Sequence, residues 1–270
     1  MNAVSTKALI IAGMRRSGTS WVAQAFHAAG LFLGDHLIPP LPSNPLGFCE
    51  DEHVIRLHTE MLRANGPAAR WVFRILRNRR LTVSPEHEAE ARRIIHQEYS
   101  RHSMWGWKDP RATLFLDLWQ RLLPGAKFVL PFRQPAEVVW SLMRAWRIRN
   151  PAGFLHAWIL HNQMIVNFAR QHADACLLIH VPDDLRPEAQ GLLVDVIVHR
   201  WSFDLPNLDF SRTYRPSLMA HPAPQWIRAI ARGYPPASGT YKDLVRLHDE
   251  LLHRHRRGTD WSYQKAPSGN

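Results

Sequence analysis

The chain has 270 residues, and its 34 Lys and Arg against 23 Asp and Glu give a formal net charge of +11. Its hydrophobic content of 46% and charged content of 21% are ordinary for a globular protein. The net charge predicts acidic partners: a phosphorylated cofactor, an anionic polymer, nucleic acid or a membrane surface.

Several classes of protein are disfavoured by what the sequence lacks. No apolar run reaches the ~18 residues of a membrane helix, and the first apolar run is too short for a signal peptide. Two cysteines, Cys49 and Cys176, make no disulfide framework, so we expect a reducing, cytoplasmic location. The 16 histidines show no H-E-x-x-H motif and no zinc-type spacing with cysteine, and we therefore expect no metal.

The first predicted elements are a strand, a loop and a helix. Residues 7–12 (KALIIA) form a short apolar run that predicts a buried strand. From Thr19 onward a helical pattern begins, in which Trp21, Val22, Ala25 and Phe26 share one face. The loop between them, residues 13–20 (GMRRSGTS), aims backbone N–H groups and a positive helix end at one point, which suits a phosphate.

The loop has the G-x4-G spacing of a Walker A loop but lacks its lysine. Gly18 is followed by Thr19 and Ser20, and the fixed positive charge lies at Arg15 and Arg16 inside the loop. A Walker lysine reaches the β/γ-phosphates of a nucleoside triphosphate, so this loop favours another anion. The alternative is an ordinary strand–turn–helix with two solvated arginines.

A proline-rich loop over residues 34–47 precedes a second helix, which carries an apolar stripe from Val54 to Leu62. Glu50, Asp51 and Glu52 lie at or before its start, where negative charge also simply caps a helix. Residues 67–80 predict an amphipathic helix with an arginine face, either solvated or binding an acidic substrate or anionic lipid. Residues 85–102 predict a polar helix.

The next segment alternates between strands and helices. We predict a strand ending near Trp107, a helix over 114–122, a strand over 128–132, a helix containing residues 138–146, a helix over 151–170 and a strand over 177–181. Pro131 is awkward within its strand because proline cannot donate to a ladder. The alternation predicts an α/β fold with a parallel central sheet flanked by helices on both faces.

The end of the chain is predicted to be less regular. We expect a helix over 187–200, a proline-rich irregular stretch over 205–240 and a last helix over about 240–257. No repeat and no linker divides the sequence, so we expect a single domain over 1–270. Its cofactor-binding core would span about 7–185, and 186–270 would form a helical and irregular region.

A second anion site is predicted at the end of the strand over 128–132. Arg133 follows the carboxyl end of this strand, where open α/β sheets bind ligands, and Ser141 lies in the following helix. A Walker B strand should end in an aspartate that holds Mg²⁺, whereas this one ends in arginine. These features argue against ATP hydrolysis and suit a nucleotide with separated anionic groups.

At this point the sequence resembles the sulfotransferases that use 3′-phosphoadenosine 5′-phosphosulfate (PAPS). Residues 13–20 look like the 5′-phosphosulfate loop of that family, and residues 132–142 (FRQPAEVVWSL) look like its 3′-phosphate motif. Residues 44–51, 105–111 and 123–135 are similar to stretches in bacterial members. The resemblance covers about residues 7–185 and implies a P-loop nucleotide-binding architecture, PAPS as donor and no metal.

The resemblance also implies site residues. The 5′-phosphosulfate would be cradled by a set from the loop and the helix start, and the 3′-phosphate would be held by Arg133 and Ser141. The loop set is Arg15, Arg16, Ser17, Gly18, Thr19 and Ser20. Trp21 stands where family members place a tryptophan against adenine, although core packing explains it equally well.

The catalytic residues implied are Glu50, Lys108 and Arg16. Lys108 would stabilise the moving sulfuryl group, Arg16 the leaving phosphate, and Glu50 would take the acceptor proton, with Asp51 and His53 as alternatives. The competing explanation for Lys108 is a structural ion pair with Asp109. The acceptor would be a hydroxyl compound, and polysaccharide, glycolipid, peptide tyrosine and small alcohol all stay open. The net charge of +11 and the arginine face at 70–77 lean toward an anionic glycan or lipid.

Two other functions stay open at this stage. One is a P-loop kinase or NTPase with a degenerate Walker A loop, although the Walker lysine is missing. The other is a basic nucleic-acid-binding module, which would interleave basic and aromatic residues on one surface. It would leave the two phosphate motifs unexplained.

Overall fold

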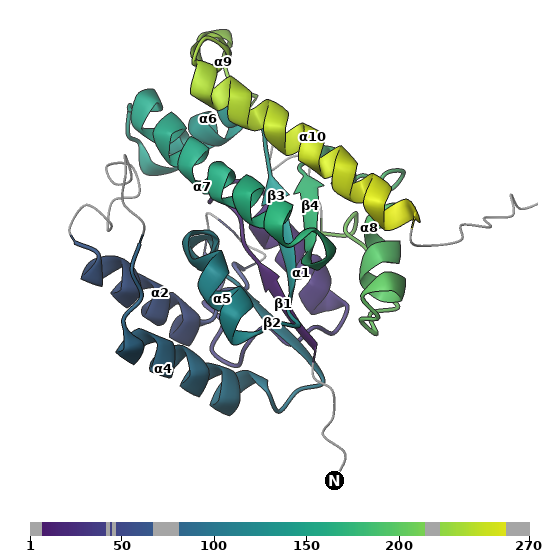
Figure 1. The fold of residues 1–270 in the computed structure, drawn as a ribbon. Helices are drawn as coiled ribbons and strands as arrows, with labels where there is room; N and C mark the ends of the chain where they lie inside the picture. Colours follow the sequence, from purple (N-terminus) through teal and green to yellow (C-terminus); the bar gives the residue numbers. More distant parts are fainter. Residues whose placement is uncertain (1–6, 42–43, 45–46, 67–80, 214–221, 258–270) are drawn as a thin grey trace, which may run out of the picture.

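The computed structural model describes residues 7–41, 44, 47–66, 81–213 and 222–257. Its centre is a sheet of four parallel strands in the order β2-β1-β3-β4 (Figure 1). The strands span β1 Lys7–Ile11, β2 Met104–Lys108, β3 Lys127–Phe132 and β4 Cys176–His180. Both the α/β class and the parallel sheet predicted from the sequence are confirmed.

Helices cover both faces of the sheet because alternate strand residues point to opposite sides. Leu9 and Ile11 of β1 belong to one core, which packs against α1 (Thr19–Ala28) and α8 (Gly191–Asp195). Ala8 and Ile10 belong to the other core, which is larger. That second core packs against α2 Glu52–Ala64, α4 Pro85–Ile94, α5 Leu116–Leu122, α6 Pro135–Trp146, α7 Pro151–Gln171 and α10 Pro235–Arg257. Each fully buried Leu or Ile contributes roughly 1.5–3 kcal/mol, so these cores fix the strand order.

The second helix begins as its capping chemistry predicts. The Asp51 carboxylate accepts hydrogen bonds from the backbone N–H of His53 (2.9 Å) and Val54 (3.3 Å). The predicted apolar stripe of α2 is buried, and it includes the side chain of His58. Asp51 is therefore the N-cap of this helix.

Pro131 fits into β3 because the neighbouring strand ends before reaching it. Val129 accepts a hydrogen bond from Ala12 N at 3.1 Å, so the backbone polar groups of residues 129 and 131 face β1. The pairing of β1 with β3 stops at Ile11 and Val129, and the chain then turns into the loop. No β1 residue pairs with Pro131, so the absence of an N–H at this position breaks no hydrogen bond of the sheet.

The middle segment differs from prediction in detail. The polar helix predicted over 85–102 is α4, which continues as a π-helical turn, η1 (Ile95–Tyr99). The helix predicted over 114–122 begins earlier, as a 3₁₀ turn, η2 (Pro110–Phe115), before α5. Trp146, the last residue of α6, is exposed. The amphipathic helix predicted over 67–80 lies outside the described residues.

The C-terminal part is more helical than predicted. The helix predicted over 187–200 is α8 followed by a π-helical turn, η5 (Val196–Arg200), and short 3₁₀ turns cover Ala173–Ala175 and Asp183–Leu185. Within the stretch predicted as irregular, α9 covers Gln225–Arg232 and α10 begins at Pro235. That stretch was predicted to be irregular because it is rich in proline. Pro235 and Pro236 instead occupy the first turn of α10, where no N–H is needed.

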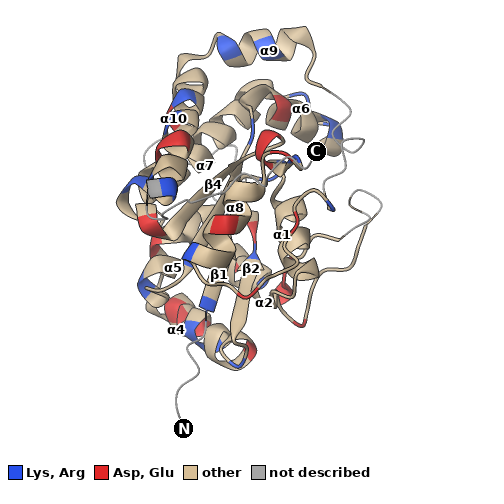
Figure 2. Cartoon of the chain, turned by 90° about the vertical axis from the view of Figure 1, so that its right-hand side faces the viewer, with Lys and Arg blue, Asp and Glu red and all other residues tan. Residues whose placement is uncertain are grey.

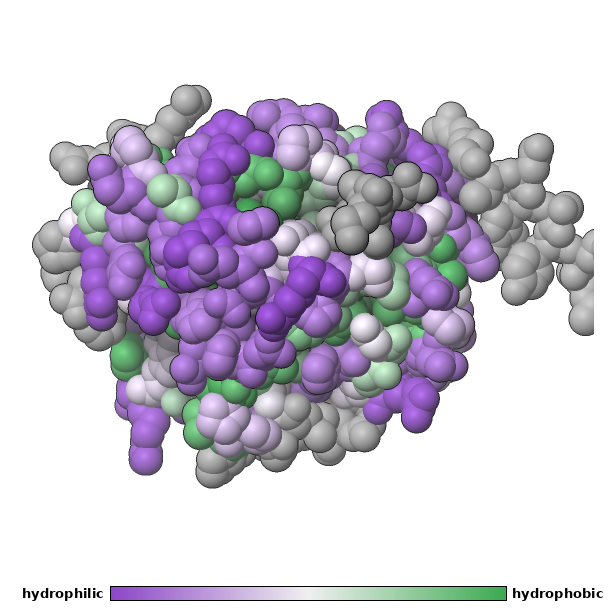
Figure 3. All heavy atoms as spheres, turned by 90° about the horizontal axis from the view of Figure 1, so that it is seen from below, coloured by the Kyte–Doolittle hydropathy of each residue, from purple (hydrophilic) through white to green (hydrophobic). Residues whose placement is uncertain are grey.

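The surface carries charge of both signs and no large apolar face in the view from below. Figure 2 shows basic residues on α9 and residues of both charges on α4 and α10. Hydrophilic residues cover most of the face seen in Figure 3, with apolar residues in small separate groups. Among the described residues, no helix has the length and apolar character needed to cross a membrane. That the chain forms a single domain, in which the cofactor-binding core ends near residue 185, stays a prediction.

Candidate active site

The loop from Gly13 to Ser20 connects β1 to α1 and requires glycine at two places. A Cβ atom on Gly13 would lie 2.5 Å from the carbonyl oxygen of Pro131, and one on Gly18 would lie 2.8 Å from Cγ1 of Val181. Gly18 also has a φ of +88° at the start of α1. Larger residues at these positions would push the loop away from the carboxyl edge of the sheet.

The side chains of this loop divide between the surface and the interior. Arg15 and Arg16 are exposed, whereas Ser17 and Thr19 are buried. The Ser17 hydroxyl oxygen is buried and has no hydrogen-bond partner among the described residues. A buried hydroxyl at a helix start that donates to no protein group is suited to an anionic oxygen.

Arg16 joins the two segments that were predicted to bind the two phosphates. Its Nε donates a hydrogen bond of 2.8 Å to Oγ of Ser141 on α6. Arg16 keeps access to solvent, but the protein around its guanidinium removes part of its hydration and lowers its pKa, and the neighbouring Arg144 charge lowers it further. An anion bound beside Arg16 would offset the repulsion that it experiences from the Arg144 charge.

Arg133 follows β3 at the carboxyl edge of the sheet, as predicted. Its Nη2 lies 3.4 Å from Oε2 of Glu137, and its carbonyl accepts a hydrogen bond from Trp158 Nε1 at 3.1 Å. Glu137 also contacts Arg228 of α9 at 3.3 Å and the backbone N–H of Ala223 at 3.2 Å. The Glu137 carboxylate thus has partners that do not depend on Arg133.

Lys108 and Glu50 meet in the interior, although their positions in the sequence are far apart. Lys108 Nζ lies 2.6 Å from Oε1 of Glu50 and donates a second hydrogen bond of 3.2 Å to Oγ of Ser20. Burial lowers the pKa of Lys108, while the Glu50 carboxylate opposes this by favouring the ammonium form. The ion pair that Lys108 forms is thus with Glu50, and not with Asp109 as the competing explanation had it.

Asp109 belongs to a second buried network beneath this pair. Its Oδ2 lies 2.7 Å from Nδ1 of His58, and Trp119 Nε1 donates a 3.0 Å hydrogen bond to His58 Nε2. Since Nε2 accepts, Nδ1 carries the imidazole proton and donates to Asp109. Burial alone would raise the pKa of Asp109, but His58 and Arg111 together hold it below its usual range.

Arg111 connects the two networks. Its Nη1 lies 3.3 Å from Oδ1 of Asp109, and its Nη2 lies 4.0 Å from Oε2 of Glu50. Sequence reasoning missed His58, Arg111 and Trp119. The only signal was a histidine within the apolar stripe of α2, which suggests a buried polar partner.

The alternatives to Glu50 as a base occupy other positions. Asp51 caps α2, and His53 Nδ1 lies 3.5 Å from Glu98 Oε1. Of the three candidates, Glu50 is the one paired with Lys108. Trp21 is half-buried against the core around α1, and its carbonyl accepts a hydrogen bond from the Thr213 hydroxyl at 3.0 Å.

Comparison with known proteins assigns this architecture to a family. Residues 8–180 match the model of the sulfotransferase family. The chain therefore belongs to the sulfotransferase family, as its two anion-binding motifs suggested. No match was found among curated protein sequences.

Solved structures of similar fold are also sulfotransferases. The sulfotransferase domain of the olefin synthase from Synechococcus PCC 7002 aligns with a TM-score of 0.50 at 17% identity, covering 91% of this chain and 94% of that one. Sulfotransferase STF1 from Mycobacterium tuberculosis H37Rv aligns with a TM-score of 0.47 at 13% identity, covering 88% of this chain and 78% of that one. The sulfotransferase domain of the curacin biosynthetic pathway aligns with a TM-score of 0.46 at 15% identity, covering 91% of this chain and 97% of that one. At 17% identity, the likeness to the olefin synthase domain shows a shared fold and no shared substrate.

Proposed function

We propose that this protein transfers a sulfuryl group from PAPS to a hydroxyl of an acceptor. The observation that carries the proposal is the position of Lys108, whose ammonium contacts both Ser20 at the end of the loop and Glu50. A donor held by the loop and an acceptor hydroxyl beside Glu50 would both adjoin this one cation. When bound, PAPS supplies an activated sulfuryl group with a phosphate leaving group.

The described residues fit such a donor on two grounds. Gly13 and Gly18 let the loop pack closely against Pro131 and Val181 at the carboxyl edge of the sheet, and the buried Ser17 hydroxyl lacks a protein partner among the described residues. Arg16 and the loop N–H groups would bind the 5′-phosphosulfate, together with Arg15, Thr19 and Ser20. Arg133 and Ser141 would bind the 3′-phosphate.

Each catalytic residue has a distinct task in this proposal. Glu50, whose carboxylate is paired with Lys108, would take the proton of the acceptor hydroxyl. Lys108 would then bind charge developing on the transferred group, as in the analogous phosphoryl transfers. Arg16 would neutralise the leaving phosphate.

An anionic glycan or glycolipid is the acceptor class that we favour. The net charge is +11, and a cavity of about 420 Å³ is lined by Trp140, Trp226, Met143 and three arginines. Those arginines are Arg144, Arg147 and Arg149. Indole faces suit sugar rings and guanidinium groups suit sulfate or carboxylate, so the lining matches an acidic saccharide.

A transfer assay tests the proposal. The purified chain is incubated with radiolabelled PAPS and with acidic polysaccharides, neutral glycolipids, tyrosine peptides or simple alcohols. We expect label on an acidic glycan or glycolipid, and none with Lys108→Ala. Transfer to no acceptor class by a protein that binds PAP (3′-phosphoadenosine 5′-phosphate) would contradict the acceptor assignment, and failure to bind PAP would contradict the donor.

A further inference from the structure

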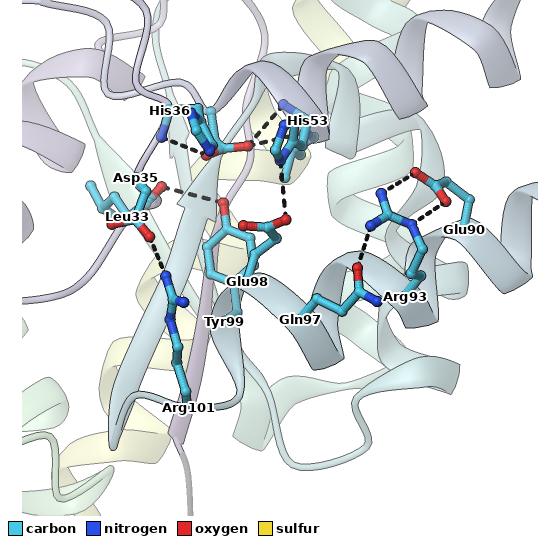
Figure 4. A network of polar contacts seen from close by, with 12 residues as sticks. Leu33, Asp35, His36, His53, Glu90, Arg93, Gln97, Glu98, Tyr99 and Arg101 are labelled. Carbon is cyan, nitrogen blue, oxygen red and sulfur yellow. Dashed lines mark hydrogen bonds and ion pairs between the residues drawn. The ribbon is translucent and has the colours of Figure 1, made fainter.

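Outside the candidate active site, three metal-ligating side chains from separate segments converge. They are His36 from the loop after α1, His53 from the first turn of α2, and Glu98 from the π-helical turn η1. One ligand atom from each lies within 4.8 Å of the other two. Figure 4 shows the two imidazole rings beside each other with the Glu98 carboxylate below His53.

The spacing of these atoms is close to that of a tetrahedral metal site. Zn²⁺ binds imidazole nitrogen and carboxylate oxygen at about 2.0–2.2 Å, which places two ligand atoms of a tetrahedron about 3.3–3.5 Å apart. His53 Nδ1 and Glu98 Oε1 already lie 3.5 Å apart. The rings of His36 and His53 have centroids 4.6 Å apart, and because His36 is exposed, rotation of its side chain can close the remaining distance.

The nitrogen that faces Glu98 lacks a hydrogen bond. His53 Nδ1 is shielded from solvent and has no hydrogen-bond partner among the described residues. A buried ring nitrogen of this kind is suited to a bound group, since buried polar atoms normally have partners. A metal ion between His53 and Glu98 would satisfy it.

The backbones that carry the three ligands are held together independently of any metal. The Asp51 carboxylate accepts hydrogen bonds from the backbone N–H of both His36 (3.4 Å) and His53 (2.9 Å). Tyr99, next to Glu98, donates its hydroxyl to the Leu33 carbonyl at 3.4 Å. These bonds fix the loop, the start of α2 and η1 against one another, so binding would order few additional groups.

We propose that His36, His53 and Glu98 form a binding site for one divalent transition-metal ion, of which Zn²⁺ fits best. Two imidazoles and one carboxylate are the donor set of a three-ligand zinc site, with a fourth position left for water. Ca²⁺ and Mg²⁺ prefer all-oxygen ligands and fit less well. The sequence predicted no metal, because positions 36, 53 and 98 match no short ligand motif.

The metal would brace the segment that carries Glu50. Ile38 donates its backbone N–H to the Glu50 carbonyl at 2.8 Å, and Glu52 donates to the His36 carbonyl at 2.9 Å. An ion on His36 would thus tie the backbone around Glu50 to η1. This consequence rests on the proposed function, whereas the site itself does not.

Metal binding is measured on the full chain after treatment with EDTA and removal of the chelator. Co²⁺ serves as the probe because its visible absorption reports ligand number, and Zn²⁺ is titrated by calorimetry. We expect one ion per chain, with His53→Ala and Glu98→Gln each weakening Zn²⁺ affinity at least about tenfold, since even residues that only support ligands are worth 10–100-fold. His96→Ala is the matched control, because His96 is exposed on the same π-helical turn.

A second readout keeps the result independent of folding defects. Zn²⁺ should raise the melting temperature of the wild type and of His96→Ala, but not that of Glu98→Gln. A wild type that is folded yet shows no Co²⁺ absorption would overturn the proposal, as would Zn²⁺ affinity unchanged by both ligand substitutions. PAP binding is measured on the same metal-free samples, so failure of the metal site is distinguished from failure of the proposed function.

Discussion

Lys108 and Glu50 form a buried ion pair with an N–O distance of 2.6 Å at the carboxyl edge of the sheet, and Lys108 also donates to Ser20 of the glycine loop. Glu50 is 4% exposed and Lys108 is 1% exposed. Removing one partner of such a pair leaves a buried charge without compensation, which costs about 3–5 kcal/mol. Loss of stability alone therefore does not argue against a catalytic role for Lys108.

A double substitution separates stability from catalysis at this pair. We expect Lys108→Met and Glu50→Gln each to lower the melting temperature, and the double variant to be more stable than the sum of the single effects predicts. Transfer activity should stay low in all three proteins, because neither charge is restored. Recovery of turnover in the double variant would show that the pair is only structural.

Glu50→Gln should separate donor binding from acceptor activation. The amide cannot take a proton, so we expect kcat per folded molecule to fall by about 10²–10⁴, the usual contribution of a general base. PAP affinity, measured by calorimetry, should change little because the role proposed for Glu50 is to act on the acceptor and not on the donor. Asp51→Asn is the control: loss of its capping charge should mainly affect stability. If Glu50→Gln keeps full turnover, the base lies elsewhere, and His53→Ala becomes the test.

Arg133→Ala should selectively weaken ligands that carry a 3′-phosphate. A hydrogen bond to a charged group is worth about 1.5–3 kcal/mol, so PAP affinity should fall roughly 10–100-fold, while affinity for adenosine 5′-phosphate should be nearly unchanged. The fold should tolerate the change because Glu137 keeps Arg228 and the Ala223 N–H as partners. Arg228→Ala, which contacts the same carboxylate from α9, should leave both affinities intact. Equal losses for both ligands in Arg133→Ala would contradict its assignment to the 3′-phosphate.

Stability should depend on pH through His161. Burial lowers the pKa of His161 to about 4, with a further small lowering from Arg15, while its hydrogen bond to the Ala157 carbonyl opposes the shift. The pKa of His161 in the folded protein lies below its unfolded value of about 6.5. The contribution of the neutral, buried imidazole to the free energy of unfolding is therefore fully present above pH 6.5, and up to about 3 kcal/mol of it is lost as the pH falls toward 4. His161→Leu should flatten this part of the curve of unfolding free energy against pH. An unchanged slope in His161→Leu would place the titration elsewhere.

Local patterns in the sequence were enough to predict the sheet and the loop. Each of these signals lies within one short segment of the sequence: the apolar run of β1, the glycines at 13 and 18, and the apolar faces of α1 and α6. The strand and both helices lie within a few residues of their predicted bounds. Contacts between distant positions could not be read in this way. Lys108 and Glu50 were named separately, and their pairing became visible only when β2 and the segment before α2 were brought together.

The misses have physical reasons as well. His58 lies on the buried stripe of α2, where periodicity does not distinguish a histidine that binds Asp109 from one that merely fills space. The stretch 205–240 was predicted to be irregular because its prolines alone do not show whether they stand outside helices or, as Pro235 does, in the first turn of one.

The donor is the central claim, and calorimetric titration of PAP into the wild-type chain in the presence of EDTA tests it most directly. The arrangement of the glycine loop, Arg16, Arg133 and Ser141 predicts that PAP binds without Mg²⁺ and that ATP, which has no 3′-phosphate, binds at least about tenfold more weakly. Equal affinity for ATP, or binding of PAP that requires Mg²⁺, would contradict the account.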